Sequence, residues 1–279
     1  MNIAIIGTGL IGGSLALALK KNGIATHVIG VEKNLEHAEV ALDKGIVDEI
    51  LPLNEAIGKS ELIVLAVPVI AATDMIAGIL DQVNKQVVFD TGSTKCDICN
   101  AALQSAHRGR FVATHPMWGT EFSGPSAALQ GAFKGNAVVI SDREKSDPDA
   151  VALVESIYLK LGMNLLYMNA DAHDVHAAYV SHISHITSFA LANTVLEKEK
   201  EEHTIFGMAS GGFESTVRLA KSNADMWVPI FKQNRENVLD VLNEHISQLR
   251  KFKSCLEKEN YEYLAELIGQ SNKIKRILK

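Results

Sequence analysis

Residues 2–12 read NIAIIGTGLIG, and this stretch decides the fold. Its first five residues form an apolar run of strand length, and Gly7, Gly9 and Gly12 follow with the spacing G-x-G-x-x-G. An apolar pattern of helical period continues over residues 10–21. The order of strand, glycine turn and helix predicts the start of an α/β domain.

The rest of the first half repeats this alternation. Short apolar runs of strand length, most of them separated by stretches long enough for a helix, recur at residues 28–31, 62–67, 87–89, 111–113, 137–140 and 164–168. Strands that alternate with helices indicate a doubly wound parallel sheet, an arrangement of the Rossmann type. A last helix of this half is expected over residues 147–161.

The second half has a different pattern. We predict one long helix over residues 171–198, and further helices around residues 214–220, 227–256 and 261–278. No Pro/Gly-rich linker separates the halves, so the boundary is placed where the pattern changes. The prediction is therefore a Rossmann-type α/β domain over residues 1–169, followed by an all-α dimerisation domain over residues 170–279.

Charge and composition disfavour several classes of protein. The 27 Lys and Arg residues against 33 Asp and Glu residues give a net charge of −6, which argues against a nucleic-acid or anionic-membrane partner. No apolar stretch reaches the roughly 18 residues of a membrane-spanning helix, and the first residues do not read as a signal peptide. Three cysteines are too few for a disulfide framework, so we expect a cytoplasmic protein. For the pair Cys96 and Cys99, ordinary packing on a helix is favoured over redox chemistry.

The glycine stretch predicts a dinucleotide site. Gly7 permits a tight turn, Gly9 lets the backbone approach a pyrophosphate, and Gly12 lets the helix pack closely against the strand. The start of the helix, at Leu10 and Ile11, supplies free N–H groups for the phosphate oxygens.

Glu32 indicates which dinucleotide binds. It stands at the end of the second expected strand, where a carboxylate accepts hydrogen bonds from the adenosine ribose hydroxyls and repels a 2′-phosphate. NAD is therefore the expected cofactor and NADP is less favoured, although the neighbouring Lys33 would weaken this preference; a solvated carboxylate is the simpler alternative. We also expect Pro68 to contact the cofactor.

Two loops that follow expected strands carry the candidate chemistry. Residues 90–95 read DTGSTK, where Ser93 could bond near the nicotinamide and Lys95 could cap a loop or meet an anion, unless the segment is an ordinary helix cap. Residues 114–121 read THPMWGTE, and His115 is the candidate base because an imidazole takes up a proton near neutral pH. A structural hydrogen-bonding role is the alternative for His115.

Histidines gather at the start of the expected long helix, at His173, His176, His182 and His185. Their H-x-x-H spacings point towards a metal, but no Cys or second carboxylate completes a ligand shell, so no metal site is predicted. Substrate binding and structural polar contacts are the two remaining interpretations. Further along, Arg218 has the planar donor group that suits a carboxylate.

Together these segments make the sequence resemble the prephenate/arogenate dehydrogenase family of tyrosine biosynthesis. The resemblance covers nearly the whole chain, in order: the glycine stretch, residues 90–95 and 115–121, the histidine cluster, and Gly211-Gly212-Phe213 with Arg218, Lys221-Ser222 and Trp227. It implies a Rossmann domain followed by a helical dimerisation domain, hence a homodimer, and an NAD(P)-dependent oxidative decarboxylation. The length suggests the monofunctional form.

The resemblance also implies roles for individual residues. His115 would accept a hydrogen bond from the C4 hydroxyl of the substrate ring, and Ser93 would align nicotinamide and substrate. The other residues implied to bind the substrate, line its pocket or stand at the entrance are His173, His185, Arg218, Gly211, Trp227 and Glu121.

We therefore expect NAD-dependent conversion of prephenate to 4-hydroxyphenylpyruvate, CO2 and NADH. Arogenate, which would give tyrosine directly, is the first alternative, because an acid near the side-chain pocket would favour its ammonium group. A second is another Rossmann-plus-helical dehydrogenase of the β-hydroxyacid type. A third is an NAD-binding module without catalysis, for which the glycines and Glu32 would suffice.

Overall fold

The computed structural model describes residues 1–202 and 204–277. The chain forms two compact units, one spanning Met1–Asn234 and one that begins at Arg235. The first unit contains the sheet and every residue predicted for the site. No helix in the described part of the chain is both long enough and apolar enough to cross a membrane.

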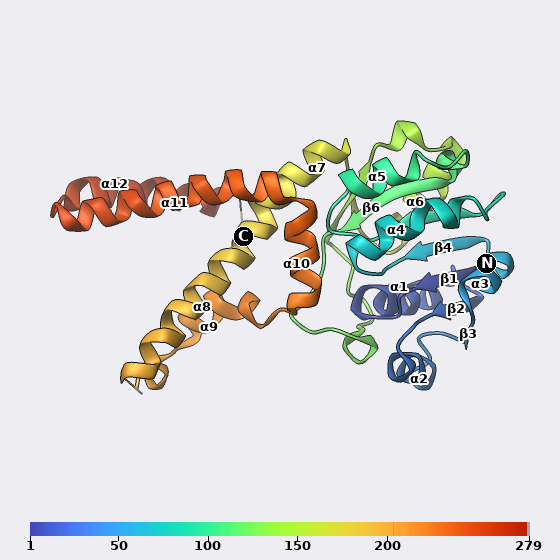
Figure 1. The fold of residues 1–279 in the computed structure, drawn as a ribbon, viewed down its shortest axis with the longest axis horizontal. Coiled ribbons are helices and arrows are strands. Elements are labelled where there is room, and N and C mark those ends of the chain that lie inside the picture. The colour runs from blue at the N-terminus through green and yellow to red at the C-terminus, as the bar shows by residue number, and fades with distance from the viewer. Residues whose placement is uncertain (203, 278–279) are drawn as a thin grey trace. The chain divides into compact units, whose positions relative to one another are not determined.

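One mixed sheet forms the centre of the first unit (Figure 1). Within the described residues it has eight strands in the spatial order β3-β2-β1-β4-β5-β6-β7-β8. Their bounds are β1 (Asn2–Ile6), β2 (His27–Val31), β3 (Glu49–Ile50), β4 (Leu62–Leu65), β5 (Val87–Asp90), β6 (Phe111–Pro116), β7 (Ala137–Ser141) and β8 (Asn164–Met168). The predicted doubly wound α/β architecture is confirmed, and β3, whose two residues are too short to give a pattern, is an addition to it.

One strand pair departs from the expected parallel arrangement. The pairs from β3 across to β6 are all parallel, whereas β6 and β7 are antiparallel. The segment between β6 and β7 contains only a short 3-10 turn, Pro125–Ala127, and no crossover helix. A parallel return needs a crossover, so the chain comes back antiparallel; β8, which follows the helix α6 (Pro148–Lys160), is parallel to β7.

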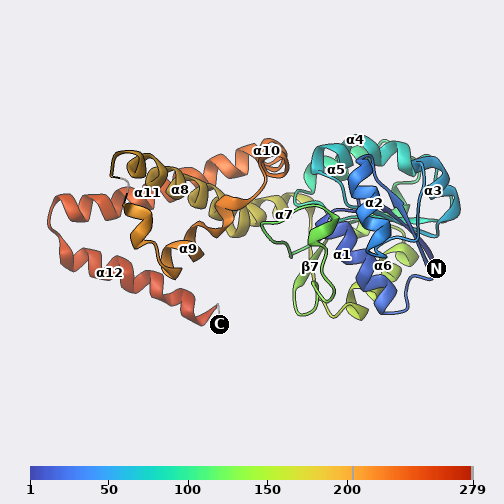
Figure 2. The ribbon, with the colours of Figure 1, turned by 90° about the horizontal axis from the view of Figure 1, so that it is seen from below.

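Alternate residues of the buried strands pack on opposite faces of the sheet, as the two-residue period of a strand requires. Ile3 and Ile5 belong to the cluster that includes residues of α1 (Leu10–Lys21), α2 (Leu35–Asp43) and α6. Ala4 and Ile6 belong to the cluster with α3 (Leu53–Lys59), α4 (Val69–Leu80) and α5 (Cys96–Ala102). Figure 2 shows α3, α4 and α5 on one side of the sheet and α1 and α6 on the other.

The helix predicted over residues 171–198 contains an irregular turn. It consists of α7 (Ala170–Ala177), a π-helical turn over Ala178–His182, and α8 (Ile183–Glu202). A π turn accommodates more residues per turn than an α-helix, so it changes the angle between side chains on either side of it. His173 and His185 lie on either side of this turn, so the angle between them differs from that in a regular α-helix.

The helix predicted over residues 227–256 is interrupted at Asn234. After α9 (Gly211–Val217), α10 runs over Ala224–Gln233, and α11 begins at Arg235. Asn234 is buried, and its side-chain amide donates to the carbonyl oxygen of Asp174 and contacts His182 Nδ1. These tertiary hydrogen bonds hold Asn234 outside helical geometry, which the local sequence pattern could not reveal.

The second unit is a pair of helices, α11 (Arg235–Glu257) and α12 (Tyr261–Ser271), with a 3-10 turn over Asn272–Arg276. Glu259 adopts a positive φ of 54° in the connection, and the Asn260 side chain accepts a hydrogen bond from the N–H of Tyr263 to cap α12. The helix was predicted to continue to residue 278, which lies outside the described residues. The α-helix itself ends earlier, at Ser271.

Candidate active site

The predicted site residues of the first half lie at one edge of the sheet. Strands β1, β4, β5 and β6 are parallel neighbours in the order β1-β4-β5-β6, so their carboxyl ends meet there. The loops that leave β1, β4 and β5 carry Gly7, Pro68 and Ser93, and His115 lies near the end of β6 itself. This is the edge at which open α/β sheets bind ligands.

The glycine turn has the backbone geometry of a dinucleotide loop. Gly7 has a φ of +91°, and a Cβ there would lie 2.5 Å from the carbonyl oxygen of Ala66. A Cβ on Gly12 would lie 2.0 Å from the carbonyl oxygen of Gly7, whereas a Cβ on Gly9 would meet no atom within 4 Å. The turn is therefore tight where α1 packs against β1 and open at Gly9, so it fits a pyrophosphate at the helix N-terminus.

Glu32 is held in place by the glycine turn. Its Oε2 accepts hydrogen bonds from the backbone N–H of Thr8 at 3.1 Å and from Thr8 Oγ1 at 3.0 Å, and its Oε1 accepts one from the N–H of Asn34 at 3.1 Å. Thr8 is fully buried. The carboxylate is therefore a fixed group directly after β2, beside the glycine turn, rather than a freely solvated side chain.

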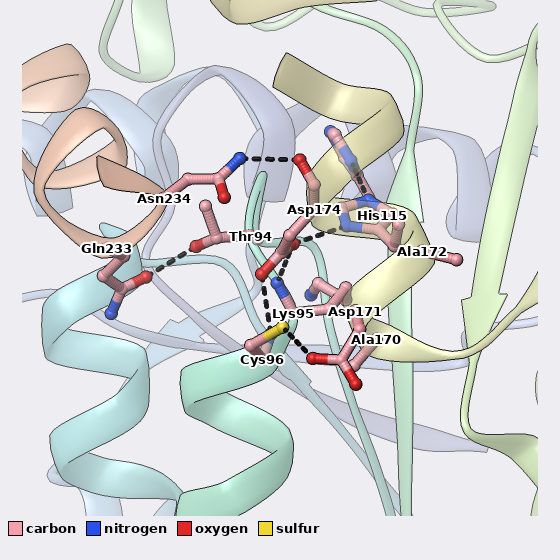
Figure 3. A network of polar contacts seen from close by, with 12 residues as sticks. Thr94, Lys95, Cys96, His115, Ala170, Asp171, Ala172, Asp174, Gln233 and Asn234 are labelled. Atoms are coloured by element: carbon pink, nitrogen blue, oxygen red, sulfur yellow. Dashed lines mark hydrogen bonds and ion pairs between the residues drawn. The ribbon is translucent and has the colours of Figure 1, made fainter. Parts of the chain in front are cut away.

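His115, at the end of β6, belongs to a chain of buried hydrogen bonds (Figure 3). Its Nδ1 lies 2.8 Å from His173 Nε2, and His173 Nδ1 lies 2.8 Å from Asp174 Oδ1. The exposed fractions of the three residues are 9%, 2% and 2%. The structure thus places His173 against His115. Neither this contact between two histidines nor the hydrogen bond between His173 and Asp174 was predicted from the sequence.

Burial keeps the imidazoles of His115 and His173 neutral. It is the main cause that lowers the pKa of His115 well below its usual value, and the neighbouring His173 and Lys95 act in the same direction. Burial also lowers the pKa of His173, although its hydrogen bond to Asp174 opposes the shift. A neutral imidazole can accept a proton or a hydrogen bond, which is the property that a base needs.

A buried ion pair supports the strand end that carries His115. Lys95 Nζ, fully buried, pairs with Asp90 Oδ2 and donates to the carbonyl oxygen of Thr114 at 2.9 Å. Asp90 Oδ1 accepts the N–H of Thr114 at 3.0 Å, and Thr114 Oγ1 contacts the hydroxyl of Tyr158 at 2.7 Å. The anion that Lys95 meets is therefore the carboxylate at the end of β5, and the pair holds Thr114, the residue that precedes His115.

Arg218 and Glu121, both predicted for the site, form an ion pair. Arg218 Nη1 lies 3.0 Å from Glu121 Oε2, and the Arg218 side chain is half exposed. Glu121 also lines an open pocket of about 680 Å³, whose lining residues are Thr120, Glu121, Phe122, Ser123, Ser126, Ala127, Leu129, Lys221 and Asn223. The volume falls within the range of small-molecule pockets.

A second pair of predicted residues stacks. The ring of His185 lies on that of Trp227, with centroids 3.5 Å apart and an interplanar angle of 28°, and His185 Nδ1 lies 3.1 Å from the carbonyl oxygen of Ser181. Trp227 is buried, and its Nε1 has no hydrogen-bond partner among the described residues. The Ser93 side chain makes no hydrogen bond within the described residues, and Gly211 is exposed at the start of α9.

The histidine and cysteine motifs show no metal or thiolate geometry. Within residues 1–202 and 204–277, no three potential ligands from His, Cys, Asp and Glu gather as a metal site would require. Burial raises the pKa of Cys99 to about 12, and burial together with Asp174 and Asp171 raises that of Cys96. Neither thiol is activated, because a reactive cysteine needs a lowered pKa.

The buried histidines predict a loss of stability in mild acid. Burial lowers the pKa of His115, His173 and His185, and it lowers that of His182 to about 4. In the unfolded chain each titrates near pH 6.5, so below that pH the unfolded state binds protons that the folded state resists. Each histidine then removes up to about 1.4 kcal/mol of unfolding free energy per pH unit until its folded-state pKa is reached.

Urea unfolding between pH 7.5 and pH 4.5, followed by tryptophan fluorescence, measures this slope. Both tryptophans, Trp118 and Trp227, lie in the first unit with the histidines. The variant His182→Gln should show a shallower slope between pH 6.5 and about pH 4, whatever its absolute stability. A wild-type stability that stays constant from pH 7.5 to pH 5 would contradict the prediction.

Comparison with known proteins identifies the family of the chain. The nucleotide-binding domain of prephenate dehydrogenase matches residues 15–167, and the dimerization domain of prephenate dehydrogenase matches residues 169–270. Prephenate dehydrogenase of Bacillus subtilis is 29% identical over 266 residues, which are 94% of this chain and 72% of that protein. Cyclohexadienyl dehydrogenase of Zymomonas mobilis is also 29% identical, over 284 residues, with 100% and 96% covered.

A solved structure shares the fold over almost the full length. It is the crystal structure of prephenate dehydrogenase from A. aeolicus in complex with hydroxyphenyl propionate and NAD+, with 30% sequence identity and a TM-score of 0.85. The similarity covers 99% of this chain and 97% of that one. With two family models that together span most of its sequence, the chain belongs to the prephenate dehydrogenase family.

Proposed function

We propose that the chain is an NAD-dependent prephenate dehydrogenase, which converts prephenate to 4-hydroxyphenylpyruvate and CO2 with formation of NADH. The observation that carries the proposal is a neutral, buried His115 at the sheet edge that also bears the glycine turn. A relative of known structure, 30% identical, holds both NAD+ and a hydroxyphenyl compound. The combination of a base and a dinucleotide loop at one edge is what hydride removal from a ring carbinol requires.

His115 performs the central step in this proposal. When bound, NAD accepts the hydride that leaves C4 of the substrate ring. His115 Nε2 accepts the hydrogen bond of the C4 hydroxyl and stabilises the positive charge that develops there as the hydride departs. With that charge stabilised, the bond to the ring carboxylate breaks, CO2 leaves, and the bonding electrons complete the aromatic ring.

Other predicted residues would bind and orient the substrate. Arg218 is proposed to hold the carboxylate of the substrate side chain, for which the guanidinium supplies two parallel donors. Glu121 contacts Nη1, and the Arg218 side chain is half exposed, so the guanidinium is accessible to a further carboxylate. His185, stacked on Trp227, would present a polar nitrogen beside an apolar surface. Gly211 would complete the pocket lining, and Ser93 would align the substrate with the nicotinamide.

The cofactor would be held by the glycine turn and Glu32. The N–H groups of Leu10 and Ile11 begin α1 and would face the pyrophosphate together with Gly7, Gly9 and Gly12. Pro68, at the start of α4, would close the nicotinamide side of the same edge. Because Thr8 and Asn34 fix the Glu32 carboxylate, a 2′-phosphate would meet a negative charge that cannot turn away, which favours NAD over NADP.

The domain division, assembly and location are parts of the same proposal. A boundary at residues 169/170 is supported by the two family matches, which end at residue 167 and begin at residue 169. The second match is to a dimerization domain, so we propose a homodimer formed through the helical domain. The three cysteines are free, which suits the reducing cytoplasm.

Arogenate is the second candidate substrate, and one observation favours it. Glu121 lies 3.0 Å from Arg218, so a carboxylate stands beside the guanidinium that we propose for the side-chain carboxylate. Arogenate carries an ammonium next to that carboxylate, and Glu121 could accept a hydrogen bond from it.

Assays of the purified protein with prephenate or arogenate, each with NAD or NADP, test the proposal. The highest kcat/KM is expected for prephenate with NAD, measured from NADH absorbance and confirmed by the aromatic product. A higher kcat/KM with arogenate would establish the second candidate, and a preference for NADP would overturn the role of Glu32. Absence of turnover with all four combinations would refute the proposed function.

A further inference from the structure

We infer that Asp174 is a positioning residue that sets the tautomers of His173 and His115, so that His115 presents an unprotonated Nε2 to its ligand. Asp174 does not reach the edge of the site itself; it acts through two imidazole rings. The inference rests on the proposed function only for its effect on turnover. The tautomers themselves are a property of the ligand-free protein.

The carboxylate of Asp174 is surrounded by donors. Oδ1 accepts the N–H of Lys95 at 2.7 Å and lies 2.8 Å from His173 Nδ1, and Oδ2 accepts the N–H of Cys96 at 2.9 Å. Burial opposes its ionisation, but the hydrogen bonds from His173 and Cys96 outweigh burial and lower the pKa of Asp174. The group is therefore an ionised carboxylate at neutral pH, which can only accept.

Asp174, an acceptor at one end of this series of hydrogen bonds, determines which nitrogen of each ring carries the proton. His173 must carry its hydrogen on Nδ1 to donate to Asp174, and a neutral imidazole then has a bare Nε2. The nitrogen that faces this Nε2, at 2.8 Å, is His115 Nδ1, which must therefore carry the hydrogen of its own ring. His115 Nε2 is left as an acceptor, and no described residue occupies it with a hydrogen bond.

The opposite arrangement requires a charge that the site disfavours. If His115 Nδ1 were the acceptor, His173 would have to donate from both nitrogens and so be an imidazolium. Burial is the main cause that lowers the pKa of His173, and Lys95 acts in the same direction, while Asp174 and Asp90 oppose the shift without reversing it. Two neutral rings with one proton each satisfy both hydrogen bonds without a charged imidazole.

Two segments distant in the sequence fix the position of Asp174. The N–H groups of Lys95 and Cys96 come from the start of α5, and Asn234 Nδ2, after α10, donates to the carbonyl oxygen of Asp174 at 2.7 Å. Figure 3 shows these contacts converging on the Asp174 residue of α7. The carboxylate is thus held in one orientation, with Oδ1 facing His173 Nδ1, and it favours the same tautomer of both rings at all times.

Asp174→Asn tests the inference because it keeps size and removes the charge. An amide has one oxygen, and Lys95 and Cys96 both present donors. With the oxygen in the place of Oδ2, the amide NH2 faces both the Lys95 N–H and His173 Nδ1; with the oxygen in the place of Oδ1, it faces the Cys96 N–H. Neither orientation satisfies all three donors, so the preference of both rings for the Nδ1–H form weakens and part of the His115 population is protonated on Nε2. We expect kcat to fall at least tenfold, by analogy with carboxylates that orient a catalytic histidine, while the Kd for NADH changes less than threefold.

Long-range ¹H–¹⁵N NMR of protein labelled at histidine reads the tautomers without substrate. In the wild type we expect the Nδ1–H form for both His115 and His173, and in Asp174→Asn a mixture of the Nδ1–H and Nε2–H forms. Asp142→Asn is the matched control, since Asp142 is a buried carboxylate that accepts the N–H of Ala170 and has a positive φ that asparagine tolerates. It should leave both tautomers and kcat unchanged.

His173→Leu keeps the experiment decisive if Asp174→Asn fails to fold. It removes the ring that transmits the effect and leaves the Lys95 and Cys96 hydrogen bonds to Asp174 intact. His115 should then populate both tautomers, and kcat should fall at least tenfold. A wild-type His115 protonated on Nε2, or a His115 tautomer that is the same in both variants as in the wild type, would overturn the inference. Wild-type protein without dehydrogenase activity would instead refute the proposed function and leave the tautomer result standing.

Discussion

His115→Asn is expected to lower kcat with prephenate by at least a thousandfold. Asparagine can still donate to His173 from the position of the lost Nδ1, but it has no atom where Nε2 stood, so the C4 hydroxyl has no acceptor. General base groups contribute about 10²–10⁴ to a rate, and here the same group also stabilises developing positive charge. Steady-state kinetics with NADH detection give kcat, and nucleotide fluorescence gives the Kd for NADH, which should change little.

His115→Gln is the matched comparison for this variant. Its longer side chain can place an amide oxygen near the former Nε2 position, so it should retain at least tenfold more activity than His115→Asn. Equal activities in the two variants would indicate that an acceptor at this position is unimportant. If His115→Asn retained more than a tenth of the wild-type kcat, His115 would not be the group that receives the hydroxyl hydrogen bond.

Local sequence was sufficient to predict most of the fold. The stretch 2–12 combines a strand, a turn that only glycine permits and a helix start, and each of these depends on neighbours within a few residues. The antiparallel β7 was not predicted because strand direction depends on how the chain returns, and a loop leaves no periodic signal. The breaks at the π turn and at Asn234 depend on hydrogen bonds between distant segments.

In the candidate site, too, the features set by neighbouring residues were predicted and those set by contacts between distant segments were not. His115 was singled out because it follows an apolar run of strand length, and Glu32 because it stands at the end of the second expected strand; both signals are local. The contact of His173 with His115, and that of Asp174 with the start of α5, join segments separated by more than fifty residues. Two adjacent polar residues at the start of a helix are common, so His173 and Asp174 gave no sequence signal of this arrangement.

Lys95→Met is expected to destabilise the first unit by about 3–5 kcal/mol, the usual cost of removing one partner of a buried ion pair. The side chains of Lys95 and Asp90 are 0% and 1% exposed, so methionine would leave the Asp90 carboxylate without its counter-charge and the Thr114 carbonyl oxygen without its Lys95 donor. Urea unfolding followed by tryptophan fluorescence measures the loss, because both tryptophans belong to this unit.

Two comparisons separate the charge effect from simple loss of a side chain. Lys20→Met removes a lysine whose Nζ lies 2.7 Å from Asp48 Oδ1 at side-chain exposures of 25% and 37%, and such a surface pair contributes up to about 1 kcal/mol. The double variant Asp90→Asn/Lys95→Met no longer buries an unpaired charge, so its destabilisation should be smaller than the sum of the two single variants by about 2 kcal/mol. Additive single effects, or equal losses for Lys95→Met and Lys20→Met, would mean that the Asp90–Lys95 pair does not brace the strand end that carries His115.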